Sequence, residues 1–377
     1  MQMKRFWLCA ALSAAALLLL AGCAGSGSTA APTLTVESSY PLQYAKQFTV
    51  DECTGGYELI TIADSQYLVV PQGAAVPEDL PQGTTVLQQP IENIYLVSTS
   101  AMNPIISLGA LDSIALSGTK ADGWYLPEAK AAMQAGQIAY AGKYSAPDYE
   151  TILASGCGLA IENTMIYHTP EVKEQLEKFG IPVLVERSSY ETDPLARMEW
   201  VKLYGILLGK KQEAEQLFDT QVQRVAPLEN QQPTGKSVAF FSITSNNLVT
   251  VRKGSDYVAR MIEMAGGSYV FADLTDNGNN LATINLSLED FYAGAKDADV
   301  LLYNSTIEGS IASTEQLVEK CPLLAQFKAV QNGNVWCTAQ SLFQQSMELP
   351  DLILDMNRVF TEGTPADSEL TFLTHVE

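Results

Sequence analysis

The sequence predicts an α/β protein with two Rossmann-like lobes joined by one long rigid helix. Three observations carry this prediction. Short β-type runs alternate with helical periods on both sides of a long amphipathic stretch at 192–227. Alternation of this kind indicates a largely parallel sheet covered by helices. Similar helix–strand units also occur in both halves of the 377-residue chain, which is long enough for two separate cores.

The stretch 192–227 is the predicted connection. Asp193 is a plausible N-cap and Pro194 stands at the first helical position. An apolar stripe then runs through Leu195, Met198, Val201, Tyr204 and Leu208. Gly209 and the polar run after it can end this helix, and a second apolar phase continues to Val225. At 1.5 Å per residue the whole stretch spans up to about 50 Å, so we expect a strut.

The first lobe is predicted at 34–191. Residues 58–62 and 67–70 read as a β-hairpin because they are rich in β-formers. Further strands are expected at 94–97, 114–116, 138–141, 159–161 and 182–185, with helices at 103–108, 127–134, 148–154 and 170–179.

The second lobe is predicted at 233–377. Strands are expected at 238–243, 269–271, 300–303 and 335–336, and helices at 257–265, 288–295, 314–320 and 347–360. The remaining segment, 361–377, is expected to wrap over the surface.

One unit repeats weakly between the lobes. In each lobe a cap residue precedes a helix, an acid follows two positions later, and the next strand ends in Asn. The acids are Glu150 and Glu289, and the asparagines are Asn163 and Asn304. The repeat predicts a pseudo-twofold arrangement of the lobes.

The composition excludes several classes of function. The formal net charge of −21 disfavours binding to nucleic acid and to anionic lipid. The sequence contains no GxSxG, HExxH, Walker or GxGxxG motif, so we expect no enzyme. His168 and His375 are the only histidines, and we therefore expect no dedicated metal site. We also expect no cofactor.

The N-terminus predicts export. Lys4 and Arg5 precede an apolar run from 6 to 20, which is typical of a signal peptide at 1–22. The following Leu-Ala-Gly-Cys resembles a bacterial lipobox, with Cys23 as the lipidated residue, and 23–33 would form a flexible tether. The alternative is a plain signal peptide with an incidental Cys23. We expect a protein anchored by lipid to the extracytoplasmic face of the cell membrane.

Four cysteines remain beyond the signal and the anchor: Cys53, Cys157, Cys321 and Cys337. Export permits disulfides, and four thiols allow three full pairings. Cys321 with Cys337 is the pairing to test first, and four buried free thiols are the alternative.

Several blocks resemble one family. These are NPIISLGA at 103–110, YAGKY at 140–144 followed by DYETIL at 148–153, EQLEKFGIPVLV at 174–185, and LLGK at 207–210 followed by EAE. In this order they resemble the substrate-binding proteins of bacterial ABC importers for ferric siderophores, haem and cobalamin. The resemblance covers roughly 99–360. Asn103 departs from the family pattern, which has Glu there.

The resemblance implies how the protein would work. A small-molecule ligand would lie between the lobes and be handed to a permease dimer with its ATPase. Glu150 and Glu289 match the two surface acids that dock with permease arginines. An acid in the first turn of a helix also offsets the helix dipole, which is the simpler explanation for either residue alone.

Ligand contacts are expected just after strands, because open α/β sheets bind ligands outside their carboxyl ends. The candidates are Trp124, Tyr125, Lys143, Tyr144, Asn163, Thr164, Arg187, Tyr190, Thr244, Ser245, Asn246 and Asn304. Arg252 and Tyr257 are further candidates. The alternative for each is a solvated loop side chain or a core ring. Arg187 and Lys143 favour an anionic ferric siderophore, with cobalamin or haem as alternatives. A ligand sensor or a secreted enzyme on the same scaffold is the second alternative.

Overall fold

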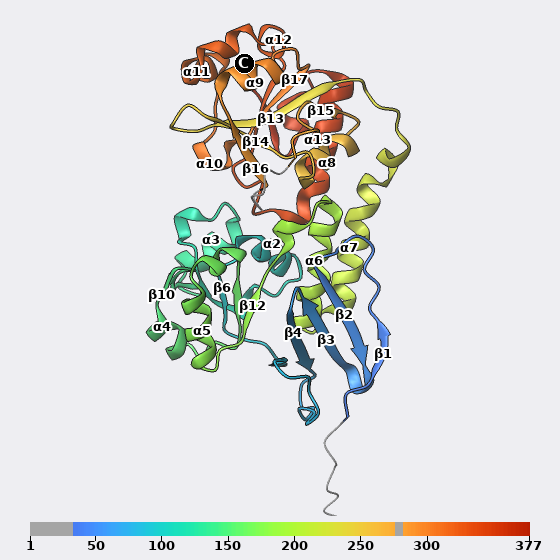
Figure 1. Cartoon of the computed structure of the whole chain (residues 1–377), viewed down its shortest axis with the longest axis vertical. Coiled ribbons are helices and arrows are strands. Elements are labelled where there is room, and N and C mark those ends of the chain that lie inside the picture. The colour runs from blue at the N-terminus through green and yellow to red at the C-terminus, as the bar shows by residue number, and fades with distance from the viewer. Residues whose placement is uncertain (1–32, 276–281) are drawn as a thin grey trace, which may run out of the picture.

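The structure is a computed structural model that describes residues 33–275 and 282–377. The predicted signal peptide and Cys23 lie outside the described residues. Figure 1 shows two lobes, with the chain's first half below and its second half above. The α/β class and the two lobes are as predicted.

The first lobe contains two sheets rather than one. The first sheet joins β1 (Val36–Ser39), β2 (Phe48–Cys53), β3 (Tyr57–Ile62), β4 (Ser65–Val70) and β5 (Thr85–Gln88), in that order. The predicted hairpin at 58–70 is confirmed, because β3 and β4 pair antiparallel.

The second sheet of this lobe is entirely parallel. It orders β12 (Val183–Val185), β11 (Ala160–Glu162), β6 (Ile94–Leu96), β7 (Ile114–Ser117) and β8 (Ala139–Tyr140). Its helices are α2 (Thr99–Ser107), α3 (Pro127–Gln134), α4 (Tyr149–Ala154) and α5 (Pro170–Lys178). A small hairpin, β9 (Gly142–Lys143) with β10 (Ala146–Pro147), follows β8. The predicted alternation of strands and helices is therefore confirmed.

The second lobe is built on a seven-stranded sheet. Its order is β16 (Thr283–Leu286), β14 (Val249–Arg252), β13 (Ser237–Ile243), β17 (Val300–Tyr303), β18 (Val335–Thr338) and β19 (Leu373–His375), and β15 (Ser268–Tyr269) also pairs with β13. The helices are α8 (Tyr257–Met264), α9 (Leu288–Ala295), α10 (Ser305–Glu308), α11 (Thr314–Lys320), α12 (Lys328–Gln331) and α13 (Leu349–Glu362).

Nine short 3-10 helices are described in addition. They are η1 (Thr54–Gly56), η2 (Leu111–Ser113), η3 (Ala121–Gly123), η4 (Thr164–His168), η5 (Ser188–Tyr190), η6 (Ala226–Asn230), η7 (Pro322–Gln326), η8 (Ser346–Glu348) and η9 (Asp367–Glu369).

The C-terminal tail corrects one prediction. It does not merely wrap the surface, because β19 pairs antiparallel with β18 and Phe372, Leu373 and Val376 are buried. The Asp355 carboxylate accepts the backbone N–H groups of Thr371, Phe372 and Leu373 and thereby fixes the tail to α13.

Two antiparallel strands of this sheet, β14 and β16, were also not predicted from the sequence.

The connecting stretch is two helices, not one continuous helix. These are α6 (Pro194–Leu207) and α7 (Lys211–Val225), which pack against each other. Gly209 breaks the helix with φ at 68°, a conformation that favours glycine. A Cβ on Gly205 would lie 2.4 Å from that of Ala214, so glycine permits the close packing. The chain enters the second lobe through α7 and η6, on the right of Figure 1.

The four cysteines are free thiols in the structure. Cys53, Cys321 and Cys337 are buried, and Cys157 is half-buried. The suggested bridge between Cys321 and Cys337 is therefore not formed, and the free-thiol alternative describes the structure. Burial raises the pKa of the Cys157 and Cys337 thiols, which lowers their reactivity.

Candidate functional site

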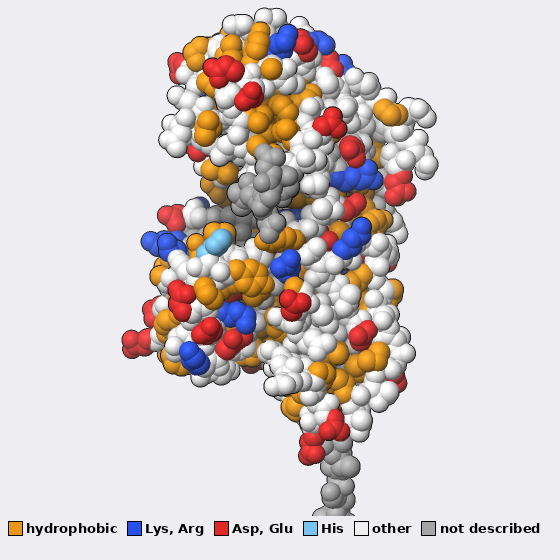
Figure 2. Space-filling view, in the orientation of Figure 1, with side chains coloured by type: hydrophobic (Ala, Val, Ile, Leu, Met, Phe, Trp, Pro, Cys, Tyr) orange, Lys and Arg blue, Asp and Glu red, His pale blue; other side chains and the backbone are white. Residues whose placement is uncertain are grey.

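The carboxyl ends of the two main sheets face each other, and hydrogen bonds at this edge join the lobes. Asn103 of α2, which follows β6, accepts the Met347 N–H at 2.7 Å. Gln344, which follows β18, donates to the Gly123 carbonyl at 2.8 Å, and Gly123 lies in the loop after β7. In Figure 2 the surface is indented between the lobes. The lobe junction is therefore where a ligand could contact both sheets.

Exposed apolar side chains gather at the same edges. Eleven large hydrophobic side chains are exposed among the described residues, and seven of them lie at or just after strands that end at this edge. They are Tyr125, Tyr140, Met165, Tyr167 and Tyr190 in the first lobe, and Leu248 and Ile307 in the second. Large apolar side chains are usually buried, and a gathering of exposed ones marks a binding surface. Tyr140, Met165, Tyr167, Leu248 and Ile307 were not among the predicted contacts, although their positions after strands could have signalled them.

Most of the predicted contact residues lie where the sequence placed them. Exposed or half-buried positions after strands are held by Tyr125, Lys143, Tyr144, Asn163, Thr164, Arg187, Tyr190, Thr244, Ser245 and Asn246. Ser245 and Asn246 form the turn between β13 and β14, and the Thr244 hydroxyl closes that turn by accepting the Leu248 N–H at 3.1 Å. These positions agree with a cleft, while ligand contact by each residue stays a prediction.

The structure corrects the prediction that Trp124 contacts the ligand. Its side chain is 1% exposed, and its Nε1–H donates to the Ser117 hydroxyl at 3.2 Å inside the first lobe. The ring therefore fills the core under the loop that carries Tyr125. A Gly-containing loop suggested a rim position, but an indole is large enough to bury itself when its N–H finds a partner.

The matched asparagines have a structural explanation. Asn163 caps η4 by accepting the Met165 N–H at 2.9 Å, and Asn304 caps α10 by accepting the Thr306 N–H at 3.2 Å. Both lie where a strand turns into a helix, a place that favours Asn. Asn304 is only 5% exposed, so its side chain is not open to a ligand in this structure. The repeat thus reflects capping at equivalent positions.

Arg187 and Tyr190 form one unit at the end of β12. The guanidinium lies over the Tyr190 ring, 4.5 Å from its centroid, and its Nε–H donates to the Gln47 side chain at 3.3 Å. Stacking holds the cation at the cleft edge and leaves its other N–H groups available to an anion.

A second group of cations lies at the junction of the lobes. Arg252 packs over Phe343, 4.6 Å from the ring centroid, and approaches the Asp256 carboxylate at 3.5 Å. Arg197 of α6 lies over the Tyr257 ring of α8 at 4.8 Å. Burial raises the pKa of Asp256 against the opposing effect of Arg252. Arg252 and Tyr257 were further candidates, and Arg197 was missed because its position within a helix gave no signal of a site.

Glu150 and Glu289, the two acids expected to dock with a permease, occupy equivalent positions in the two lobes. Glu150 lies in the first turn of α4 and Glu289 in the first turn of α9, and both are exposed. Asp148 and Ser287 cap these helices through side-chain acceptors. The two carboxylates therefore project from fixed helix starts, one in each lobe.

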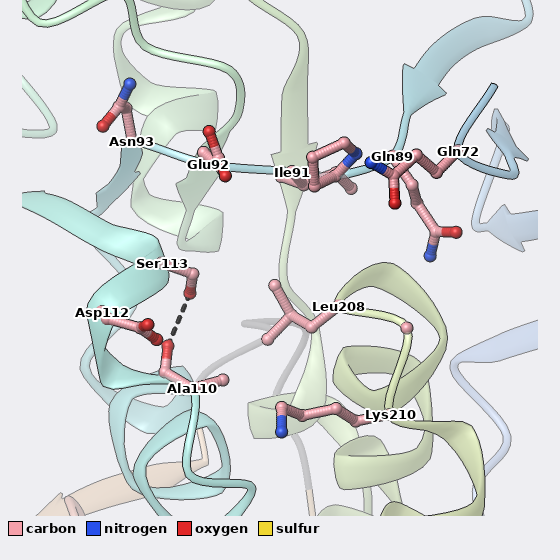
Figure 3. Close-up of a pocket in the computed structure, with 12 residues that line it drawn as sticks. Gln72, Gln89, Ile91, Glu92, Asn93, Ala110, Asp112, Ser113, Leu208 and Lys210 are labelled. Atoms are coloured by element: carbon pink, nitrogen blue, oxygen red, sulfur yellow. Dashed lines mark hydrogen bonds between the residues drawn. The ribbon is translucent and has the colours of Figure 1, made fainter.

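Outside this cleft, the described residues line two further cavities. The one in Figure 3 measures about 430 Å³ and lies near the amino ends of β6 and β7, with Asp112, Leu208 and Lys210 in its lining. The other measures about 390 Å³ and lies beside η6, where Arg260 of α8 approaches Asp193 at 3.8 Å. In the described part of the chain, no group of three or more His, Cys, Asp or Glu side chains could hold a metal ion.

A match to a known protein family identifies the family of this chain. The periplasmic binding protein family model matches residues 97–341. The chain belongs to the periplasmic binding protein family. Solved structures agree with this fold at low identity. This periplasmic binding protein is similar to the periplasmic haem-binding protein HutB of Vibrio cholerae, with a TM-score of 0.57, 17% identity, and 73% of this chain and 99% of that chain covered.

Two further structures are similar. The Fe³⁺-hydroxamate transport protein of Saccharomonospora viridis has a TM-score of 0.55 and 22% identity, covering 72% of this chain and 94% of that one. The vitamin B12-binding protein BtuF of Vibrio cholerae has a TM-score of 0.51 and 15% identity, covering 72% and 99%. At these identities the likeness concerns the fold alone.

Curated relatives come from Methanocaldococcus jannaschii. The uncharacterized lipoprotein MJ0878 is 28% identical over 241 residues, which are 62% of this chain and 55% of that protein. The uncharacterized protein MJ0642 is 26% identical over 170 residues, which are 44% and 49%. The matched region thus spans about half the length of either relative. Within residues 33–275 and 282–377, no helix has the length and apolarity to cross a membrane.

Proposed function

We propose that this protein is an extracytoplasmic lipoprotein that captures a ferric siderophore and delivers it to an ABC importer. Membership of the periplasmic binding protein family supports the transport role. The observation that carries the proposal is the gathering of exposed aromatic and apolar side chains at the facing carboxyl edges, four of which are tyrosines. Apolar faces with a few placed polar groups are typical of small-molecule sites.

The charge of the cleft edge favours an anionic chelate. Arg187 is held against Tyr190, Lys143 is exposed on β9, and the Lys120 ammonium lies 5.5 Å from the Tyr140 ring centroid. These cations can pair with carboxylate or catecholate groups, while the rings cover the apolar body of the chelate. Cobalamin and haem are the alternative ligands, because the similar structures include proteins named for them. In each case the metal would arrive within the ligand.

Delivery needs an anchor and a partner. Lipidation at Cys23 and a tether at 23–33 would hold the protein at the outer face of the membrane. Glu150 and Glu289 would each receive a bidentate arginine from one subunit of the permease dimer, whose ATPase drives import.

A ligand panel read by thermal shift tests the proposal. The panel contains ferrioxamine B and ferric enterobactin as siderophores, together with haemin and cyanocobalamin. A siderophore at 100 times its Kd should stabilise the protein by about 2.7 kcal/mol, since only the folded state binds it. Arg187→Met should weaken that response, and the exposed α7 variant Gln223→Ala should not. A response to haemin or cyanocobalamin alone would reverse the ranking of ligands, and no response to any compound would reject the proposal.

A further inference from the structure

Glu162 is a buried acid at the base of the cleft. It is the last residue of β11, a central strand of the parallel sheet, and its side chain is 0% exposed. Successive side chains of a strand alternate between faces, so Glu162 shares a face with Ala160. Ala160 belongs to a small core with Tyr95, Ile152 and Ile166. Glu162 therefore points into the layer between the sheet and the helices α4 and η4.

This carboxyl group has no hydrogen-bond partner. Neither Oε1 nor Oε2 of Glu162 contacts a donor among the described residues. The neighbouring acid Glu186 differs, because it accepts Ser98, Ser100 and the backbone N–H of Ser188. A buried carboxylate without donors or a cation is costly, so the group stays neutral instead. Burial raises the pKa of Glu162 to about 8.

Among the described residues no cation contributes to the raised pKa of Glu162, for which burial is the cause. The Tyr95 hydroxyl on β6 donates to the Gly142 carbonyl at 2.8 Å. The Glu162 carboxyl group acts electrostatically on the Tyr149 phenol on α4. Glu171 of α5 also acts on Tyr149, and the side chain of His168 on η4 is exposed to solvent. Directly after β12, the backbone N–H of Glu186 donates to the backbone carbonyl of Glu162, not to its side chain. The Glu186 carboxylate accepts the Ser98 hydroxyl instead. Ionisation of Glu162 would therefore add an uncompensated charge to the core.

Two functional elements pack on this core. Ile166 comes from η4, which begins directly after Asn163 at the cleft edge, and Ile152 comes from α4, which carries Glu150. If the buried carboxyl ionises, the lowest-cost response is a local opening that lets water reach it. The helix α5 also packs on this core through Val172 and Leu176, and α4 and η4 are the elements whose movement would reach the docking acid and the cleft edge.

We propose that Glu162 is a positioning residue that keeps the cleft segment η4 and the helix α4 in place only while its carboxyl group is protonated. The part that concerns ligand affinity rests on the proposed function. Stability should fall with rising pH, because the folded state holds a proton that the unfolded state loses near the ordinary pKa of 4.5. The stabilisation is complete below that pH and is lost as the pH rises through about 8.

Glu162→Gln tests this directly, because the amide is isosteric and cannot ionise. Glu171→Gln, on the exposed start of α5, is the matched control. Unfolding free energy is measured from about pH 5 to pH 9. We expect the wild type and Glu171→Gln to lose stability across this range and Glu162→Gln to lose much less. Parallel profiles in all three proteins would overturn the proposal. If Glu162→Gln folds poorly, Glu162→Met fills the same volume and should give the same flat profile.

Two local readouts separate positioning from general stability. Hydrogen exchange, corrected for intrinsic rate, should rise at pH 9 in 149–154 and 163–168 of the wild type but not of Glu162→Gln. Ferrioxamine B affinity should fall about fivefold or more between pH 6.5 and pH 9 in the wild type, and less than about twofold in the variant. Unchanged exchange in both segments would reject the positioning role. If no siderophore binds at any pH, the proposed function fails, and the stability and exchange results still decide the role of Glu162.

Discussion

The Gln344 side chain of the second lobe accepts the backbone N–H of Tyr125 in the first lobe at 2.8 Å. The same amide donates to the Gly123 carbonyl at 2.8 Å, so one side chain holds the loop that presents the Tyr125 ring. Asn103 and Met347 add a second connection deeper in the junction. With such ties at the cleft, we expect only small lobe motion on ligand binding.

Gln344→Ala should loosen this loop. Two hydrogen bonds are lost, and each contributes about 0.5–1.5 kcal/mol to stability. We expect ligand affinity to fall about fivefold to tenfold because Tyr125 is no longer fixed in place. Isothermal titration and denaturant unfolding measure both quantities, with Gln223→Ala as the exposed control. Full affinity in Gln344→Ala would show that the loop does not contribute.

Glu199→Ala should destabilise the first lobe severely. The carboxylate is 0% exposed and accepts the backbone N–H groups of Gln43, Tyr44 and Ala45 together with the Lys202 ammonium at 2.7 Å. Its removal leaves Lys202 buried without a counter-charge, which costs about 3–5 kcal/mol. Denaturant unfolding measures the loss. A double variant, Glu199→Ala with Lys202→Met, also removes the unpaired Lys202 charge and should recover part of the lost unfolding free energy. No recovery would contradict this explanation.

Asp299 should contribute to stability in a pH-dependent way. Burial raises its pKa, but hydrogen bonds from Lys328 and Ser237 outweigh this and lower the pKa to about 2. The contribution is present above the ordinary value of 3.8 and is lost as the pH falls towards 2. Because Lys328 is half exposed, the effect stays below about 1 kcal/mol. Asp299→Asn should lower unfolding free energy at pH 7 and converge with the wild type near pH 2; a constant difference would argue against it.

Glu150→Ala and Glu289→Ala should weaken association with the permease and spare ligand affinity. The two carboxylates are exposed in the first turns of α4 and α9, and neither residue is among the predicted ligand contacts. Glu128→Ala is the control, because Glu128 is an exposed acid in the first turn of α3 outside the matched pair. Association is measured with the permease complex in nanodiscs. An equal loss in Glu128→Ala would favour a helix-dipole effect, and a loss of ligand affinity would place the acids in the pocket.

The sequence predicted regular elements well where the pattern was strong. The bounds of α3, α9, β17 and α11 agree with the expected ranges. Ser287 and Ser313 cap the starts of α9 and α11, and Pro127 opens α3. The break at Gly209 was an open alternative, since a glycine can end or merely interrupt a helix. The hairpin of α6 and α7 depends on Gly205 meeting Ala214, a contact that a local pattern does not contain.

The site was harder to predict than the fold. Most of the candidate residues lie after strands at one edge, as expected from the topology, and their contact with a ligand stays a prediction. Burial could not be read from position alone, so Trp124 and Asn304 were taken as contacts and proved to be a core ring and a helix cap. Arg197 and Glu162 were missed because each belongs to a regular element and gains its environment only through packing.

A crystal structure of the protein with the best ligand of the panel tests the central claim most directly. We expect one chelate between the lobes, contacted by Arg187 and Tyr190 from the first lobe and by the segments containing Leu248 or Ile307 from the second. A chelate bound elsewhere, such as the cavity beside Lys210, with the cleft edge unoccupied, would contradict the account.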